Sequence, residues 1–165
     1  MIEVLDALPA NDARRAELIQ LLNKTMKSVV HYQDKTSGVW FDVMDVTDHR
    51  NYLESTASCM FAYVLLKGSR LGYLDSTYRQ AGFKAYEGIV HRFIRVNADK
   101  TISLTDCCAV SGLGPGPGLY VKKPNLKRDG SFEYYMSEPV RDNDAKGIGP
   151  FIWASLEVEG LNNGL

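Results

Sequence analysis

The chain has 165 residues, a length typical of one domain with its own core. Its hydrophobic fraction of 45%, its charged fraction of 24% and its formal net charge of -1 are those of an ordinary globular protein. This charge gives no electrostatic reason to expect nucleic-acid binding. The longest strongly apolar stretch, residues 59–66, is far shorter than the roughly 20 residues that span a bilayer, so no membrane insertion is expected.

The N-terminal residues and the cysteines exclude further classes. Residues 1–6 carry acidic side chains and no basic region, unlike a secretory signal, which favours a cytoplasmic location. The three cysteines form no CxxC pair and the three histidines are scattered, so neither a disulfide framework nor a metal site is expected.

The first half of the chain predicts two helices separated by a loop. Asn11 and Asp12 precede an amphipathic helix of about six turns, which ends near Val30. Residues 34–50 contain several aspartates and a Ser-Gly pair, which predict a long loop. Small and apolar side chains then occupy every face of residues 52–66, as is typical of a buried helix.

The second half predicts two more helices. Asp75 and Ser76 precede an amphipathic helix whose apolar stripe ends at Phe93. A short strand is expected at residues 100–104, and residues 105–146 form a predicted loop, a length that usually signals function. The last helix, residues 147–159, again looks buried. This alternation of amphipathic and apolar helices is what two concentric rings of helices require.

A weak internal repeat supports this alternation. It aligns residues of the two halves in the same order: Gly38 with Gly130, Trp40 with Phe132, Met44 with Met136, Asn51 with Asn143, Phe61 with Trp153 and Ala62 with Ala154.

Polar residues open the first apolar helix. Asn51, Glu54, Ser55 and Ser58 share one helical face, where each buried polar group left unpaired would cost about 1 to 3 kcal/mol. They either bond to neighbouring backbone and loop amides or face a wet cavity that holds a ligand.

The loop before this helix carries Trp40 and Asp42. An exposed tryptophan stacks well against the apolar face of a sugar ring, while a neighbouring carboxylate binds the hydroxyls. The alternative is that Trp40 packs the loop onto the helical core.

Asn143 and Lys146 offer a second polar group at the start of the last helix. A lysine at a helix N-terminus opposes the macrodipole, which favours anions there. Lys146 therefore either binds an anionic ligand such as a uronate carboxylate or forms a salt bridge with Asp144 or Glu54.

Long motifs resemble the unsaturated rhamnogalacturonyl hydrolases of glycoside hydrolase family 105. The matching segments cover nearly the whole chain and keep the family order: 37–41 (SGVWF), 51–63 (NYLESTASCMFAY), 67–73 (KGSRLGY), 84–88 (KAYEG), 112–114 (GLG), 128–135 (RDGSFEYY), 137–139 (SEP) and 143–149 (NDAKGIG).

The resemblance implies an all-α fold, a partial (α/α)6 toroid in which residues 1–165 are a single domain and the C-terminal half of the barrel. It implies a substrate with a 4,5-unsaturated galacturonyl residue, released from pectin and hydrolysed by vinyl-ether hydration, with no metal or organic cofactor. The catalytic aspartate belongs to the N-terminal half of the family fold, which this chain does not contain, so no catalytic residue is assigned. The matched positions are expected to line the substrate cavity: Trp40, Asn51, Glu54 and Lys146.

Two functional interpretations follow. The chain is part of a hydrolase that binds an unsaturated uronate oligosaccharide, or it is a non-catalytic helical module that binds such a sugar or a partner chain. Half a toroid leaves the flanks of residues 52–66 and 148–156 uncovered, which predicts self-association or a partner that supplies the N-terminal half.

Overall fold

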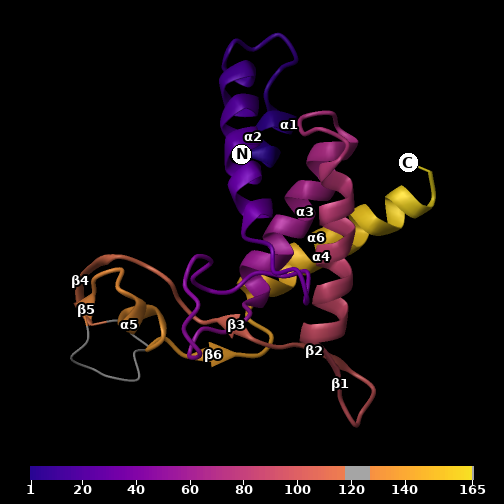
Figure 1. Cartoon of the computed structure of the whole chain (residues 1–165). Coiled ribbons are helices and arrows are strands. Elements are labelled where there is room, and N and C mark those ends of the chain that lie inside the picture. Colours follow the sequence, from indigo (N-terminus) through magenta and orange to yellow (C-terminus); the bar gives the residue numbers. More distant parts are fainter. Residues whose placement is uncertain (118–126, 165) are drawn as a thin grey trace.

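The computed structural model describes residues 1–117 and 127–164 and is mostly helical (Figure 1). Its helices are α1 (Ile2–Ala7), α2 (Arg14–His31), α3 (Ser55–Arg70), α4 (Tyr78–Phe93), α5 (Phe132–Tyr135) and α6 (Ala145–Asn162). Its strands are β1 (Ile94–Val96), β2 (Ile102–Leu104), β3 (Cys107–Cys108), β4 (Gly114–Pro117), β5 (Lys127–Arg128) and β6 (Val140–Arg141). They form three antiparallel pairs, β1 with β2, β3 with β6 and β4 with β5.

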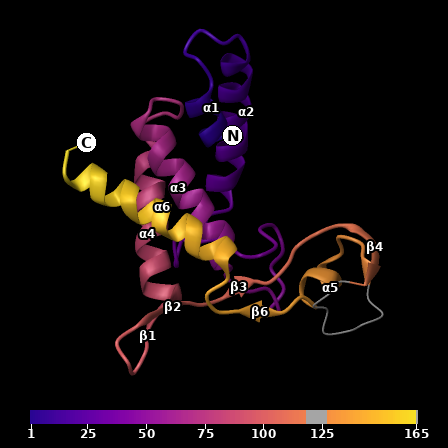
Figure 2. The same ribbon diagram turned by 180° about the vertical axis from the view of Figure 1, so that it is seen from behind.

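Helix α3 is the centre of the molecule. It packs along α4 on one side and is crossed obliquely by α6, an arrangement that is clear in both ribbon views (Figures 1 and 2). The close approach of α3 and α4 depends on Gly82, where a Cβ would lie 2.9 Å from the Cγ atom of Leu66. Helices α1 and α2 lie beside the upper part of α3 in Figure 1, whereas the small strands and α5 gather at the lower end.

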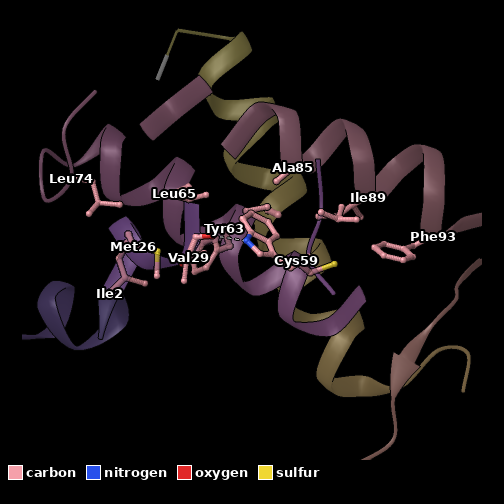
Figure 3. Close-up of a cluster of buried hydrophobic side chains, with 14 of the residues drawn as sticks. Ile2, Met26, Val29, Cys59, Tyr63, Leu65, Leu74, Ala85, Ile89 and Phe93 are labelled. Atoms are coloured by element: carbon pink, nitrogen blue, oxygen red, sulfur yellow. Dashed lines mark hydrogen bonds between the residues drawn. The ribbon is translucent and has the colours of Figure 1, made fainter. Parts of the chain in front are cut away.

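The core lies between α2, α3 and α4. The apolar stripes of α2 and α4 both point inward at α3, which explains their amphipathic patterns. Figure 3 shows the principal side chains of this cluster, which come from α1 and α2 (Ile2, Met26, Val29), from α3 (Cys59, Tyr63, Leu65), from the following turn (Leu74) and from α4 (Ala85, Ile89, Phe93).

The predicted helices of the core are present, with shifted ends. Helix α3 begins at Ser55 rather than at residue 52, because Leu53 forms an antiparallel bridge with Phe41. Helix α1 and strand β1 were not predicted. The predicted all-α class is therefore correct for the core, but the segments that connect the helices contain short strands. Residues 105–146 hold β3 to β6 and α5, although residues 118–126 lie outside the described part.

Helix α6 differs from the prediction of a helix buried on all sides. Ile152, Trp153 and Leu156 are 51%, 49% and 58% exposed, because no described element covers that flank. The uncovered flank of the last helix was itself predicted and is confirmed. Among the described helices, none combines the length and the apolar character needed to cross a bilayer.

The internal repeat agrees with the structure at four positions. Gly38 and Gly130 both have a φ of 78°, a left-handed conformation that favours glycine. Ala62 in α3 and Ala154 in α6 are both fully buried. The two halves thus share a glycine turn and a buried alanine in the helix that follows.

Candidate functional site

The N-terminal ends of α3 and α6 meet at the lower end of the molecule, beside β3 and β6 (Figure 1). The Ser55 amide donates to the Asp106 carbonyl at 3.1 Å, which ties α3 to the segment before β3. On α6, a Cβ at Gly147 would lie 2.9 Å from Cys107 Sγ and 3.3 Å from Thr56 Oγ1, so a glycine here lets α6 pack closely against β3 and the first turn of α3.

A cavity of about 480 Å³ opens at this junction, a volume within the range of small-molecule sites. It combines carboxyl, ammonium and hydroxyl groups with apolar side chains and is lined by Asp42, Val43, Met44, Glu54, Thr56, Ala57, Met60, Cys108, Ser111, Tyr135 and Lys146.

A short antiparallel ladder places Asp42 in the cavity wall. The Asp42 amide donates to the Tyr52 carbonyl, and the Glu54 amide donates to the Trp40 carbonyl, both at 2.9 Å, on either side of the Phe41 bridge. The register of this bridge places Asp42 opposite Tyr52 and Trp40 opposite Glu54. Because alternate residues of a strand point to the same side, Asp42 and Glu54 lie on one side of the ladder.

The Asp42 carboxyl has a raised pKa. Burial and, to a smaller extent, the nearby Glu54 carboxylate together raise the pKa to about 6, against the opposing effect of the Tyr52 hydroxyl. The Asp42 Oδ2 atom and the Tyr52 hydroxyl are both buried and neither has a hydrogen bond of normal geometry, so the interaction between the two groups is weak.

Glu54 is held entirely by backbone amides. Its carboxylate caps α3 by accepting from the amides of Thr56 at 2.9 Å and Ala57 at 2.6 Å, and it also accepts from the Cys108 amide at 2.9 Å. Ser58 Oγ donates to the Glu54 carbonyl at 2.6 Å. The polar stripe of α3 therefore bonds largely to the protein itself, the first of the two predicted alternatives.

Trp40 packs into the core. Its ring is fully buried, its Nε1 donates to the Val29 carbonyl at 2.7 Å, and it meets Phe61 edge-to-face with ring centroids 5.1 Å apart. The structure thus shows the packing alternative, and the expected place of Trp40 in the cavity wall is wrong. Trp40, the largest apolar side chain of this loop, thus anchors the loop to α2.

Asn51 also lies away from this cavity. Its Nδ2 donates to the carbonyls of Val43 and Val46, each at 2.8 Å, so it holds the turn of the loop before α3. It lines a separate cavity of about 640 Å³, together with His31 and His49.

At the start of α6, Lys146 forms the predicted ion pair. Its Nζ lies 2.6 Å from Asp144 Oδ1 and donates to the Ala109 carbonyl at 2.9 Å, while its side chain lines the cavity. The hydrogen bond from Lys146 lowers the pKa of the Asp144 carboxyl, which caps α6. Asn143 does not line the cavity, since its Oδ1 accepts from the Leu104 amide at 2.9 Å.

Sequence reasoning missed several lining residues. Met44, Met60, Cys108, Ser111 and Tyr135 come from four different segments, and none has a local pattern that marks a site. Met60 and Tyr135 each lie within a family-like motif, and that was the available signal. In residues 1–117 and 127–164, no group of three His, Cys, Asp or Glu side chains could hold a metal ion.

The fold and the site define a helical protein whose central helices open onto a cavity that is large enough for a sugar ring. Residues 1–162 match the family model described as Glycosyl Hydrolase Family 88. The chain belongs to this family, and it resembles part of a family 105 type domain.

Solved and curated relatives agree. A family 105 glycoside hydrolase of C. acetobutylicum is 41% identical with a TM-score of 0.86, and the match covers 96% of this chain and 42% of that one. A possible family 105 member from Salmonella enterica is 28% identical with a TM-score of 0.72, covering 99% of this chain and 36% of that one. Protein Atu3128 of Agrobacterium fabrum is 33% identical over 162 residues, which are 95% of this chain and 66% of that protein. This chain thus spans under two thirds of each relative.

Proposed function

We propose that residues 1–165 form one domain, the C-terminal half of an (α/α)6 toroid, in a glycoside hydrolase that acts on 4,5-unsaturated galacturonyl oligosaccharides from pectin. The observation that carries this proposal is the family match over residues 1–162. The 41% identity to a family 105 hydrolase of known structure supports it. The cavity at the N-terminal ends of α3 and α6 supports it, because helices of a toroid present their loops at one mouth.

The proposed reaction is hydration of the vinyl ether in the unsaturated uronate. A proton adds to one carbon of the double bond and the hydroxyl of water to the other, giving a hemiketal that opens and releases the second sugar. We place the aspartate that moves these protons outside this chain. Glu54 is poorly suited to that role, because both of its oxygens accept backbone N–H groups.

In this proposal the present chain binds substrate. Asp42 and Lys146 face the cavity with the groups that meet hydroxyls and a uronate carboxylate, respectively. Glu54, Trp40, Asn51 and Asn143 hold the loops that shape the cavity. We further propose a cytoplasmic location and no metal or organic cofactor.

The test is activity with and without the remaining half of the fold. The chain is mixed with the N-terminal half of the C. acetobutylicum relative, and an unsaturated rhamnogalacturonan disaccharide is followed by the absorbance of its conjugated uronate. We expect absorbance to fall only when both halves are present. Turnover by this chain alone would disprove the proposal that the catalytic aspartate lies outside it. A stable absorbance with the two halves assembled would disprove the proposed substrate class.

A non-catalytic module is the second candidate. It is favoured by the engagement of Glu54 and Lys146 in structural hydrogen bonds, which leaves few free catalytic groups. This candidate predicts that the chain binds unsaturated uronate oligosaccharides without turnover, even in the presence of the other half. Calorimetry and the absorbance assay on the same sample separate the two.

A further inference from the structure

Three charged side chains line the cavity, and they differ in what remains free to bind a ligand. Glu54 accepts three backbone amides, and Lys146 is bound to Asp144 and to the Ala109 carbonyl. The Asp42 side chain alone among these three has neither a backbone hydrogen bond nor an ion pair in the described chain, and its Oδ2 atom is enclosed beside the Tyr52 hydroxyl. A ligand in the cavity would therefore meet the other carboxyl oxygen of Asp42, which is not among the enclosed atoms.

The groups around Asp42 indicate the ligand that would meet this oxygen. Met44, Met60 and Tyr135 give the cavity an apolar surface suited to the C–H face of a sugar ring. The Glu54 carboxylate is close enough to disfavour a second negative charge at Asp42 and would equally repel an anionic ligand group there. Neutral hydroxyl donors therefore fit this end of the cavity better than a carboxylate.

We propose that Asp42 is a specificity-determining residue that binds the hydroxyls of a neutral sugar ring in this cavity. In the proposed oligosaccharide this ring is the sugar that follows the unsaturated uronate, an identification that rests on the proposed function. The hydroxyl–carboxylate contact itself does not depend on any reaction.

The direction of the pH dependence follows from the groups that face Asp42. Hydroxyl donors stabilise the ionised carboxylate, so binding lowers its pKa from about 6 and releases a proton. The pKa values of Tyr52 and Cys108 are raised by burial, so both stay neutral near pH 6, and the Lys146–Asp144 pair stays charged because the Asp144 pKa is lowered. Affinity is therefore expected to fall about tenfold between pH 7 and pH 5, as the ionised fraction of Asp42 falls.

Methionine methyl groups report on this binding directly. The chain has five methionines; Met44 and Met60 line the cavity and Met26 is buried in the core. With methyl-labelled methionine, L-rhamnose is titrated as the neutral probe and D-galacturonate as the anionic probe at pH 5 and pH 7. We expect rhamnose to shift the Met44 and Met60 signals, with tighter binding at pH 7, and to leave Met26 unchanged.

Asp42→Asn is the matched variant, and Asp45→Asn on the same loop is the control, since Asp45 is exposed and outside the cavity. The first should weaken rhamnose binding at pH 7 about tenfold and abolish its pH dependence, and the control should do neither. The inference is overturned if rhamnose does not shift the Met44 and Met60 signals, or if its affinity is unchanged both by pH and by Asp42→Asn. It is also overturned if the protein binds galacturonate more tightly than rhamnose at pH 5. A failed hydrolysis assay leaves these outcomes unaffected, because they measure binding alone.

Discussion

Asp42 and Glu54 are two carboxylates on one side of the same short ladder, in opposite environments. Glu54 sits at the N-terminus of α3, where backbone N–H groups converge and the helix dipole favours an anion. Asp42 lies two residue pairs along the ladder and accepts from none of those amides, and it is desolvated beside the Tyr52 hydroxyl. One carboxylate thus stabilises the fold, while the other keeps its binding capacity.

Glu54→Ala tests the structural role. Loss of a helix cap costs about 0.5 to 2 kcal/mol, and an unpaired Cys108 amide adds about 1 to 3 kcal/mol, so we expect a loss of about 1.5 to 5 kcal/mol. Urea unfolding followed by circular dichroism measures it. Glu87→Ala, an exposed glutamate on α4 with no recorded hydrogen bond or ion pair in the described chain, serves as the control and should change stability by less than about 0.5 kcal/mol. Equal effects of the two variants would contradict this role.

Asp42→Asn should stabilise the protein at neutral pH. The pKa of Asp42 is about 6 in the folded chain and about 3.9 in an unfolded one, so the folded state binds more protons between these values. The contribution of the protonated Asp42 carboxyl to the free energy of unfolding is fully present below about pH 4, and it is lost as the pH rises through about 6. The asparagine variant should remove this loss and gain about 1 to 3 kcal/mol at pH 7. A stability difference from wild type that is constant from pH 4 to 7 would disprove it.

At the scale of elements, α4 is positioned by a glycine that contacts the loop before α3. A Cβ at Gly88 would lie 2.1 Å from the Ser37 carbonyl oxygen and 3.0 Å from Val39 Cγ1. Gly88→Ala must therefore move the loop that carries Trp40, and we expect a loss of about 1 to 3 kcal/mol in thermal or urea unfolding.

Gly149→Ala is the matched control for Gly88→Ala. Gly149 is also inside a helix, α6, but a Cβ there meets nothing within 4 Å. Alanine has the higher helix propensity, but Gly149 precedes Pro150, whose ring disfavours the helical conformation at a residue that carries a Cβ, so this variant should change stability by less than about 1 kcal/mol. A loss at Gly149 as large as that at Gly88, or tolerance of alanine at Gly88, would show that the close contact with the Ser37 carbonyl does not decide the effect.

The core helices could be predicted from local periodicity, because the inward stripes of α2 and α4 repeat at helical spacing. The site was harder to predict. Glu54 and Lys146 were correctly placed in the wall, yet Trp40 was not, since its burial depends on a contact with the Val29 carbonyl that no local pattern encodes. Cys108 reaches the cavity only through the pairing of β3 with β6, a long-range contact.

At the scale of the whole molecule, the exposed flank of α6 is the surface where we expect a partner to pack. It crosses α3 and α4 with one flank and presents the other outward (Figure 2). Trp153 remains 49% exposed although its ring lies 5.4 Å from that of Tyr63. In the proposed half-toroid this outward flank is where further helices would pack, and the chain covers only 42% of its C. acetobutylicum relative.

Without such helices, we expect the chain to associate with itself through α6, because exposed apolar patches of this kind rarely persist on a monomer. The double variant Ile152→Lys/Leu156→Glu places charges on the exposed flank and should shift sedimentation equilibrium from dimer or larger species to monomer. Val96→Lys/Ile102→Glu on the β1–β2 hairpin changes equally exposed apolar residues, 71% and 58% accessible, away from α6, and should leave the association unchanged. A wild-type chain that sediments as a monomer at all concentrations would show that the exposed apolar flank of α6 does not drive self-association. Association that survives the α6 variant would place the interface elsewhere on the chain.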